Sequence, residues 1–369
     1  MKPIRILQVV EMINENSGVS SVVMNYYRHM DHSHFIFDFM THTPVTDEIR
    51  KQLEETGSVI YEMPALTGRN IPRYKKKLDD FFLKHQEYEM IHGHLPNAAA
   101  FYLSAAKKHG IQTRILHSHN SKGADSLVKR VRNYVLNGIG VSKANVYFAC
   151  SDLASDYLFR RKKASEIKII HNAIDIDYFS YREEVRKRLR EKYKIENKLV
   201  IGHMGRFVKQ KNHRFILEIA KQLKEIRNDF VFLLVGDGPL RFEMEEAVKG
   251  AGMQEYFIFT GSVLNPQDYY QMMDVFILPS IYEGLPVVGV EAQACGLPCL
   301  FSDAITDEVM LTEQAEKLEL RDAALWAGKL AETSKIRYKE NADVIKKSGF
   351  DIKTEAKRLE EIYLELIGK

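Results

Sequence analysis

The stretch LPSIYEGLPVVGVEAQACGLP, residues 278–298, decides the fold and the function. A short apolar run ends there in a loop that carries Glu283, and Pro286 stands where a helix can begin. Glu291 follows inside an otherwise apolar helix, where a carboxylate is costly to bury without a donor such as a hydroxyl. The two acids are therefore placed to hold two hydroxylated parts of one ligand.

A second loop, upstream of this stretch, carries the cations that such a ligand could need. The predicted strand Leu199–Met204 ends in Gly205, which lets the backbone approach a ligand closely. Arg206 offers a planar fork that suits phosphate oxygens, and Lys211 offers a point charge. Asn212 starts the next predicted helix, whose N-terminal amides favour anions. The two loops together predict a site for an anionic and hydroxylated ligand.

Short β-rich runs alternate with amphipathic stretches along the whole chain, which is typical of parallel sheets covered on both faces. A length of 369 residues favours two domains, and the very charged segment 181–194 separates two series of such units. We expect an α/β fold of two Rossmann-like domains whose sheets face a central cleft. The expected domains are residues 1–178 and 179–349, with a C-terminal helix over 350–369 that packs back toward the first domain. The predicted strands are 4–10, 35–40, 59–63, 90–92, 114–117, 147–150 and 168–171, then 199–204, 230–235, 256–260, 275–278 and 298–301.

Two other nucleotide-binding motifs are incomplete. Residues 236–241, GDGPLR, begin like a GxGxxG turn but carry Arg241, and no matched ribose-binding acid follows the next strand. Residues 205–211 lack the GK[ST] of a P-loop. The sequence therefore favours neither a dinucleotide-dependent dehydrogenase nor a P-loop ATPase.

The charge is distributed unevenly, although the formal net charge is only +3. Residues 1–180 hold 24 Lys and Arg against 19 Asp and Glu, whereas the remaining residues hold 29 against 31. Three basic runs, 73–77, 129–132 and 160–163, lie in the first half. Each run is either a solvated helix face or part of a surface that attracts an anionic membrane. Nucleic acid is not an expected partner, because interleaved aromatic platforms are missing.

The compartment follows from the cysteines and the start of the chain. Cys150, Cys295 and Cys299 form no CxxC pair, which indicates a reduced, cytoplasmic setting. The first apolar run is too short for a signal peptide before it meets Glu11, so it reads as a buried strand. No apolar stretch approaches the roughly 18 residues that a bilayer requires. We expect a cytoplasmic protein that can attach peripherally to the inner face of a plasma membrane.

The segment Glu283–Glu291 resembles the E-x7-E motif of retaining GT-B glycosyltransferases. The resemblance is strongest to the large family that contains bacterial capsule, exopolysaccharide and phosphatidylinositol mannosyl enzymes, and it covers nearly the whole chain. The further matching pieces, in order, are Ser17–Gly18, His92 with His94, the strand ending at His117, Asn172–Asp175, Gly205–Asn212, Gly236–Pro239 and Phe259–Gly261. Ser17, Ser20 and Ala173 replace residues that are Gly, Glu and Gly in the family pattern.

The resemblance implies a retaining, metal-independent hexosyltransferase without a cofactor. Its donor would be a nucleoside-diphosphate sugar, with UDP favoured, bound by the second domain. Its acceptor would be a saccharide carried on polyprenyl diphosphate, bound by the first domain, in capsule, exopolysaccharide or other cell-surface glycan synthesis. The implied donor-binding residues are Gly18, Gly205, Arg206, Lys211, Gly261, Val263, Glu283, Gly284, Leu285 and Glu291; the implied catalytic residues are His117, Glu283, Arg206 and Lys211; the implied acceptor-side residues are His94, His119 and Ser20.

Two alternatives stay open. Six of the 13 histidines fall within residues 85–119, and two H-x-H pairs among them, His92 with His94 and His117 with His119, would suit a metal-dependent hydrolase. A sugar-nucleotide sensor that binds the donor without turnover is the second alternative. Within the transferase reading, His117 is preferred as the residue that contacts the donor sugar, and His119 is its substitute on the same side of the strand.

Overall fold

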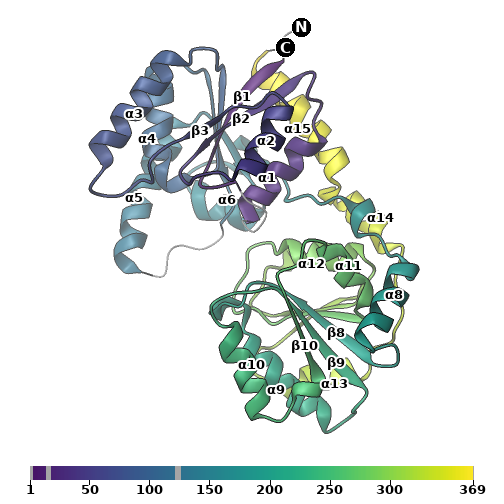
Figure 1. Cartoon of the computed structure of the whole chain (residues 1–369). Helices are drawn as coiled ribbons and strands as arrows, with labels where there is room; N and C mark the ends of the chain where they lie inside the picture. Colours follow the sequence, from purple (N-terminus) through teal and green to yellow (C-terminus); the bar gives the residue numbers. More distant parts are fainter. Residues whose placement is uncertain (1–2, 14–17, 121–125, 369) are drawn as a thin grey trace. The chain divides into compact units, whose positions relative to one another are not determined.

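The computed structural model describes residues 3–13, 18–120 and 126–368. The chain forms two compact units, the first from residues 1–173 with 352–369 and the second from residues 174–351 (Figure 1). These divisions lie a few residues from the expected ones at 178/179 and 349/350. The C-terminal helix belongs to the first unit, and the α/β class with two Rossmann-like domains is confirmed.

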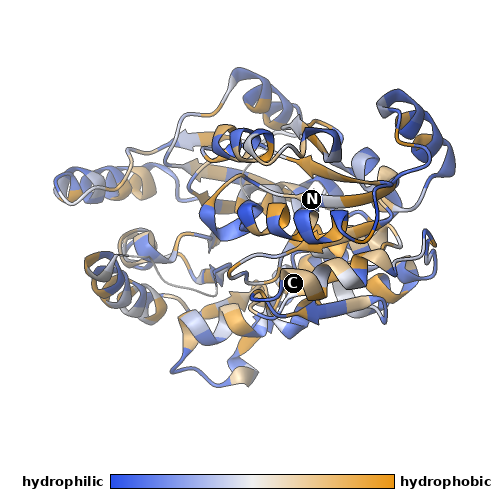
Figure 2. Ribbon diagram, turned by 90° about the horizontal axis from the view of Figure 1, so that it is seen from below, coloured by the Kyte–Doolittle hydropathy of each residue, from blue (hydrophilic) through white to orange (hydrophobic). Residues whose placement is uncertain are grey.

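The first unit is built on a seven-stranded parallel sheet with the order β3-β2-β1-β4-β5-β6-β7. Helices on both faces bury two separate groups of apolar side chains, so most strand residues have no solvent-facing side (Figure 2). The strands are β1 (Ile4–Val10), β2 (Phe35–Thr41), β3 (Ile60–Glu62), β4 (Met90–Gly93), β5 (Thr113–Ser118), β6 (Val146–Ala149) and β7 (Ile167–Ile169); the helices are α1 (Gly18–His29), α2 (Asp47–Glu55), α3 (Ile71–Lys84), α4 (Pro96–Lys108), α5 (Leu127–Lys143), α6 (Asp152–Phe159) and α15 (Ile352–Leu366).

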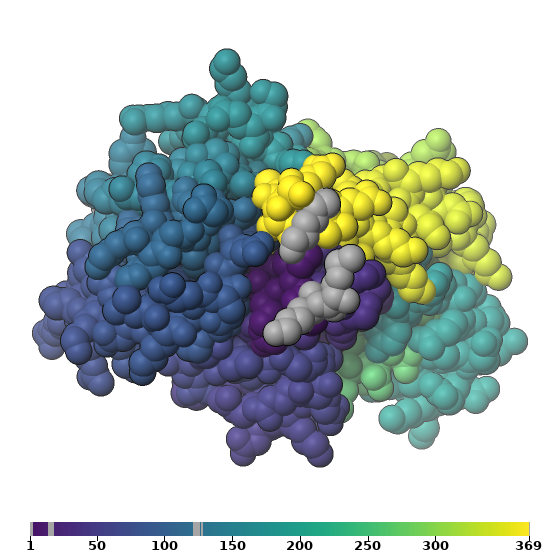
Figure 3. All heavy atoms as spheres, turned by 90° about the horizontal axis from the view of Figure 1, so that it is seen from above, coloured from purple at the N-terminus to yellow at the C-terminus, as the bar shows by residue number. Residues whose placement is uncertain are grey.

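Helix α15 completes the core of the first unit. Its apolar stripe places Ile352, Leu359 and Tyr363 in the same buried cluster as residues of β1, β2 and α1. Figure 3 shows the yellow C-terminal segment lying against the purple N-terminal part of the chain. The two ends of the chain therefore share one hydrophobic core.

The second unit is built on a six-stranded parallel sheet with the order β10-β9-β8-β11-β12-β13, again with an apolar core on each face. Strand β13 is absent from the prediction because its sequence, AEKL, carries two charged side chains and therefore has no continuous apolar run. The strands are β8 (Leu199–Met204), β9 (Phe230–Val235), β10 (Phe257–Gly261), β11 (Val275–Leu278), β12 (Cys299–Ser302) and β13 (Ala315–Leu318); the helices are α7 (Ile176–Phe179), α8 (Glu183–Tyr193), α9 (His213–Lys224), α10 (Arg241–Gly250), α11 (Pro266–Met272), α12 (Val287–Ala294), α13 (Ala323–Ala331) and α14 (Asn341–Ile345).

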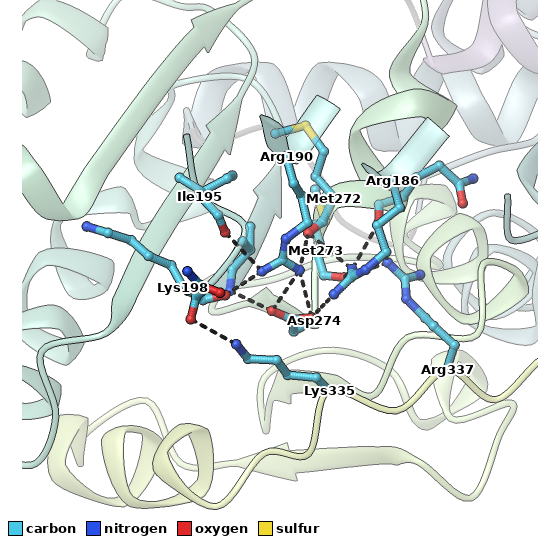
Figure 4. A network of polar contacts seen from close by, with 12 residues as sticks. Arg186, Arg190, Ile195, Lys198, Met272, Met273, Asp274, Lys335 and Arg337 are labelled. Carbon is cyan, nitrogen blue, oxygen red and sulfur yellow. Dashed lines mark hydrogen bonds and ion pairs between the residues drawn. The ribbon is translucent and has the colours of Figure 1, made fainter. Parts of the chain in front are cut away.

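A buried ion cluster fixes helix α8 to the start of β11 (Figure 4). Asp274 is fully buried between the guanidinium groups of Arg186 and Arg190, with Arg190 Nη1 3.0 Å from Asp274 Oδ1. The amide of Val200 donates to the same carboxylate at 2.8 Å. Burial alone would raise the pKa of Asp274, but the two guanidinium groups outweigh it and hold that pKa below its ordinary value. This cluster lies at the opposite end of β11 from Glu283 and is structural.

The strand order marks where a ligand can bind in each unit. In an open parallel sheet, ligands bind outside the carboxyl ends of the strands at the point where the strand order reverses. That point lies between β1 and β4 in the first sheet and between β8 and β11 in the second. The loops that follow β8 and β11 are the two that the sequence singled out.

Among the described residues, no helix is both long and apolar enough to cross a membrane.

Candidate active site

The loops after β8 and β11 are tied together by an ion pair and a glutamine. Lys211 Nζ lies 2.7 Å from Glu283 Oε1, and the two side chains are only 15% and 11% exposed. The side-chain amide of Gln210 donates to the backbone carbonyl of Tyr282 at 3.0 Å and to Glu283 Oε2 at 3.1 Å. The backbone carbonyl of Gln210 accepts from the backbone amide of Ile281. The predicted cationic and acidic loops therefore form one polar site.

The position of Lys211 depends on the residues beneath it. A Cβ atom at Gly205 would lie 3.1 Å from Lys211 Cε, so the glycine makes room for the lysine stem. Beneath the lysine, His203 donates from Nδ1 to the carbonyl of Ile277 at 3.0 Å. Burial lowers the pKa of His203 well below its ordinary value and lowers that of His213 to about 4. Both rings are neutral near pH 7, so the histidines beneath Lys211 add no charge to the site.

The glycines of residues 236–239 serve backbone packing at this edge of the sheet. A Cβ at Gly236 would lie 2.2 Å from the carbonyl oxygen of Gly205, and a Cβ at Gly238 would lie 2.7 Å from the amide nitrogen of Phe207. Gly236 also donates to the carbonyl of Gly261 at 3.0 Å. The ends of β8, β9 and β10 are thus held together closely, which fixes the loop that carries Lys211.

Glu291 lies in the second turn of α12 and has a partner from another helix. The hydroxyl of Tyr270, on α11, donates to Glu291 Oε2 at 2.7 Å. The residue as a whole is partly exposed, whereas its carboxyl group is enclosed, and this burial raises its pKa to about 7 against the opposing effect of Tyr270. Near neutral pH, a second hydroxyl donor from a ligand would favour the ionised form.

The remaining second-unit candidates border the same edge of the sheet. Arg206 is exposed and forms no ion pair with any residue that the structure describes, so its guanidinium is available to an anion. Helix α12 begins at Val287, with Leu285 buried just ahead of it. Gly261 ends β10, and Val263 packs against the core of the unit.

The first unit contains the other candidates. Gly18 is the first residue of α1, and Ser17 lies outside the described residues. Ser20 and His94 both line a pocket of about 300 Å³ at the carboxyl ends of β1 and β4, where the strand order reverses. Ser20 is thus beside a hollow of a size that suits part of a small ligand.

His94 is part of a cluster of four histidines. His92 Nε2 lies 3.1 Å from His117 Nδ1, and His94 Nδ1 lies 2.8 Å from His119 Nε2. Burial lowers the pKa of all four rings, to about 3 for His92 and about 4 for His119, so the cluster is uncharged at neutral pH. Ring nitrogens of His92, His94 and His117 lie within 4.8 Å of one another, which keeps the metal-binding alternative in view.

Two residues with evident roles at the site were not predicted from the sequence. Gln210 connects the two loops, and Tyr270 supplies the hydroxyl that Glu291 was expected to need. Neither position carries a local signal, because a glutamine in a basic turn and a tyrosine in an amphipathic helix are both ordinary. Only the fold brings them to the acids.

Comparison with known proteins identifies the class. The family model described as "Glycosyltransferase Family 4" matches residues 16–178, and the model described as "Glycosyl transferases group 1" matches residues 185–307. The "Putative glycosyltransferase EpsF" of Bacillus subtilis (strain 168) is 32% identical over 310 residues, covering 83% of this chain and 80% of EpsF. The chain therefore belongs to the glycosyltransferase family that these two models and EpsF represent, and its fold is GT-B.

Other relatives span nearly the whole chain. The UDP-Gal:alpha-D-GlcNAc-diphosphoundecaprenol alpha-1,3-galactosyltransferase of Escherichia coli is 23% identical over 97% of this chain and 96% of its own. Among solved structures, Anabaena HepE in complex with UDP superposes with a TM-score of 0.82 at 16% identity, covering 98% of this chain and all of that one. This likeness to HepE confirms the fold.

Proposed function

We propose that this glycosyltransferase moves a hexosyl unit, with retention of configuration and without a metal ion, from a UDP-sugar to a saccharide acceptor. The acceptor is carried on polyprenyl diphosphate, and the product enters a capsule, exopolysaccharide or other cell-surface glycan. The observation that carries the proposal is the paired Lys211 and Glu283, beside the exposed Arg206, at the strand-order reversal of the second sheet. The complex of HepE with UDP and the named substrates of the Escherichia coli relative support the donor and the acceptor.

The proposed reaction places each charge where the site can meet it. The bond between the sugar C1 and the β-phosphate oxygen breaks, and negative charge builds on the leaving diphosphate. Arg206 and Lys211 stabilise that charge without a metal. Glu283 accepts hydrogen bonds from sugar hydroxyls, and Glu291 accepts from the ribose. The acceptor hydroxyl attacks C1 from the side of the leaving group and gives its proton to a phosphate oxygen, while His117 contacts the donor sugar.

The donor proposal has a direct test. A panel of UDP- and GDP-sugars is incubated with the purified chain, with and without EDTA, and thermal shift and nucleotide release are measured. We expect at least one UDP-sugar to raise the melting temperature and to be turned over equally in EDTA. Stoichiometric zinc with EDTA-sensitive hydrolysis would instead establish the metal-dependent alternative. Binding of a nucleotide sugar without its turnover in the presence of any acceptor would establish a sensor.

The acceptor proposal extends to a membrane surface on the first unit. A groove of about 870 Å³ runs between α5 and α6. Val131 and Tyr134 are 59% and 64% exposed beside it, and Arg160 and Arg161 stand on its rim. Exposed apolar side chains next to arginines fit the interface of an anionic leaflet, where each basic residue contributes about 1 kcal/mol.

We predict that the double substitution Arg160→Ala with Arg161→Ala weakens binding to phosphatidylglycerol-containing vesicles at least tenfold at low salt, measured by co-sedimentation. The loss of two charges near the surface accounts for the size of the effect. The matched control is Lys76→Ala with Lys77→Ala, on the basic run of α3, which is expected to change binding much less. Equal losses in both variants would contradict attachment through α5 and α6.

A further inference from the structure

The groove between α5 and α6 and the pocket at the carboxyl ends of β1 and β4 meet at two residues. Asn137 of α5 and Tyr157 of α6 line both hollows, whose volumes are about 870 Å³ and about 300 Å³. The described residues that line them all belong to the first unit. The two hollows are therefore neighbours, and one elongated ligand can occupy both.

The groove presents an apolar stripe of α5. Val131, Val135 and Ile139 line it at intervals of four residues, so they share one face of the helix. All three are exposed, whereas Leu158 and Phe159, which line the groove from α6, are buried. Large exposed apolar side chains that gather around one hollow mark a place for an apolar ligand.

Gly138 keeps the groove open. It lies inside α5, where glycine is less favourable than alanine. Gly140, in the same helix, is explained by packing, because a Cβ there would lie 2.7 Å from Ala99 Cβ. A Cβ at Gly138 would meet no atom of the described residues within 4 Å, and Gly138 lines the groove. The packing of these residues therefore does not require this glycine, whereas an apolar chain lying in the groove would.

The charges of the groove select among apolar occupants. Arg130, Arg160 and Arg161 line it, and no carboxylate is found among the lining residues that the structure describes. A second copy of the chain would bring the same cations to this surface and be repelled. An apolar chain with an anionic head group would instead be attracted, and a diphosphate offers the oxygens that arginines bind in pairs.

Side-chain amides and a carboxylate line the neighbouring pocket. The amides belong to Asn97, Asn120, Asn133 and Asn137, and the carboxylate belongs to Glu11. A guanidinium can only donate, and Arg132 Nη2 lies 2.9 Å from Asn133 Oδ1, so the Nδ2 hydrogens of Asn133 are the ones left for a ligand. Amides offer both donors and acceptors, which is what the adjacent hydroxyls of a sugar require.

We propose that the groove and the pocket are one binding site for an amphiphilic acceptor. The isoprenoid chain lies in the groove over Gly138, the diphosphate binds Arg160 and Arg161, and the sugar lies in the asparagine-lined pocket. Both arginines follow Tyr157 within about one helical turn, so they stand close to where the two hollows meet. The identity of the ligand as the acceptor rests on the proposed function, whereas the preference of the groove for an isoprenoid diphosphate follows from its lining.

Isoprenoid diphosphates that carry no sugar test the groove on the full chain. Isothermal titration calorimetry compares farnesyl diphosphate, kept below its micelle concentration, with isopentenyl diphosphate, which has the same head group on a much shorter chain. We expect the wild type to bind farnesyl diphosphate at least about tenfold more tightly, because more apolar surface leaves water. In Gly138→Phe, whose ring occupies the groove, this preference should fall to about twofold or less.

Gly138→Ala is the matched control, because it removes the same helix glycine but adds only a methyl group. It should keep the preference for farnesyl diphosphate, and both variants should melt no lower than the wild type. Phosphatidylglycerol vesicles without isoprenoid lipid should bind Gly138→Phe and the wild type equally, since the leaflet contacts the rim of the groove. Equal wild-type affinity for the two diphosphates, an undiminished preference in Gly138→Phe, or a matching loss of vesicle binding would each overturn the proposal.

The sugar pocket is tested with complete acceptors, a panel of hexoses and N-acetylhexosamines linked through diphosphate to a farnesyl chain. For the accepted sugar, we expect Asn97→Ala with Asn133→Ala to raise the acceptor KM about tenfold, because sugar hydroxyls lose their partners. The affinity for farnesyl diphosphate should stay unchanged. Gln52→Ala, which removes an exposed amide of α2, should alter neither value.

The two measurements separate the ways in which the proposal can fail. An unchanged acceptor KM in the asparagine double variant, or an equal loss of farnesyl diphosphate affinity, would overturn the assignment of the pocket to the sugar. If no acceptor of the panel is glycosylated from any donor, the proposed function fails. Calorimetry with the two diphosphates then still decides whether the groove binds an isoprenoid chain.

Discussion

Lys211→Ala is expected to lower kcat about 100- to 1,000-fold, the loss typical of removing one preorganised donor from a developing negative charge. The ammonium group is already in place before a donor arrives, held 2.7 Å from Glu283 in the space that Gly205 leaves open. It therefore needs little reorganisation when the diphosphate leaves. Steady-state transfer to a fixed acceptor, with the donor at saturation, measures the effect.

Lys209→Ala is the matched control, because Lys209 is an exposed cation in the same short turn. Its removal should leave kcat within about twofold, since it is not placed at the site. Circular dichroism and melting curves establish that both variants are folded. Full activity in Lys211→Ala would show that the ion pair with Glu283 is only structural. A double variant, Lys211→Ala with Glu283→Ala, is expected to melt higher than Lys211→Ala alone, because it leaves no largely enclosed carboxylate without its cation.

Glu291→Gln is expected to change stability and donor binding in opposite directions. The pKa of the carboxyl is raised to about 7, above its ordinary value of about 4.5, so the folded state binds more protons between these two values. Wild-type stability therefore falls as pH rises from about 4.5 to 7, by about 2–3 kcal/mol. Glutamine keeps an oxygen for Tyr270 but does not ionise, so the variant avoids this loss and is the more stable protein at pH 8.

The same substitution is expected to raise KM for the donor about tenfold with little change in kcat. A hydrogen bond to a charged acceptor contributes more than one to a neutral amide, and the ribose is remote from the bond that breaks. Urea unfolding of both proteins at pH 5 and pH 8 gives the stability difference. Glu218→Gln, on the exposed face of α9, controls for the loss of a carboxylate. A stability difference that is the same at both pH values would contradict the raised pKa.

The sheets were predictable because strands buried on both faces leave continuous apolar runs. The strands 4–10, 199–204, 230–235 and 275–278 occur in the structure with the predicted bounds. Strand β13 was missed because its sequence, AEKL, carries two charged side chains and has no such run. The acidic and cationic loops could also be found, because glycines and helix starts are local signals that mark where the backbone approaches a ligand.

Partners from distant parts of the chain could not be predicted. Tyr363 is 271 residues from His92, and Tyr270 reaches Glu291 from a different helix. Nothing in either local sequence separates these tyrosines from those that only fill a core. Their roles depend on the strand order and on the path of the last helix, which a pattern of apolar residues does not specify. The H-x-H pairs were visible, but the contacts of their rings across the two strands were not.

The discontinuous first unit has a consequence for biosynthesis. Residues 174–351 form a unit that is continuous in sequence, so it can fold as soon as it has left the ribosome. The first unit is begun earlier, yet it lacks Tyr363 and the rest of α15 until translation has passed residue 366. Until then, the side chains of β1, β2 and α1 that α15 covers stay open to water, and His92 lacks its hydrogen-bond partner Tyr363. The half of the protein that is translated first is therefore the half that is finished last.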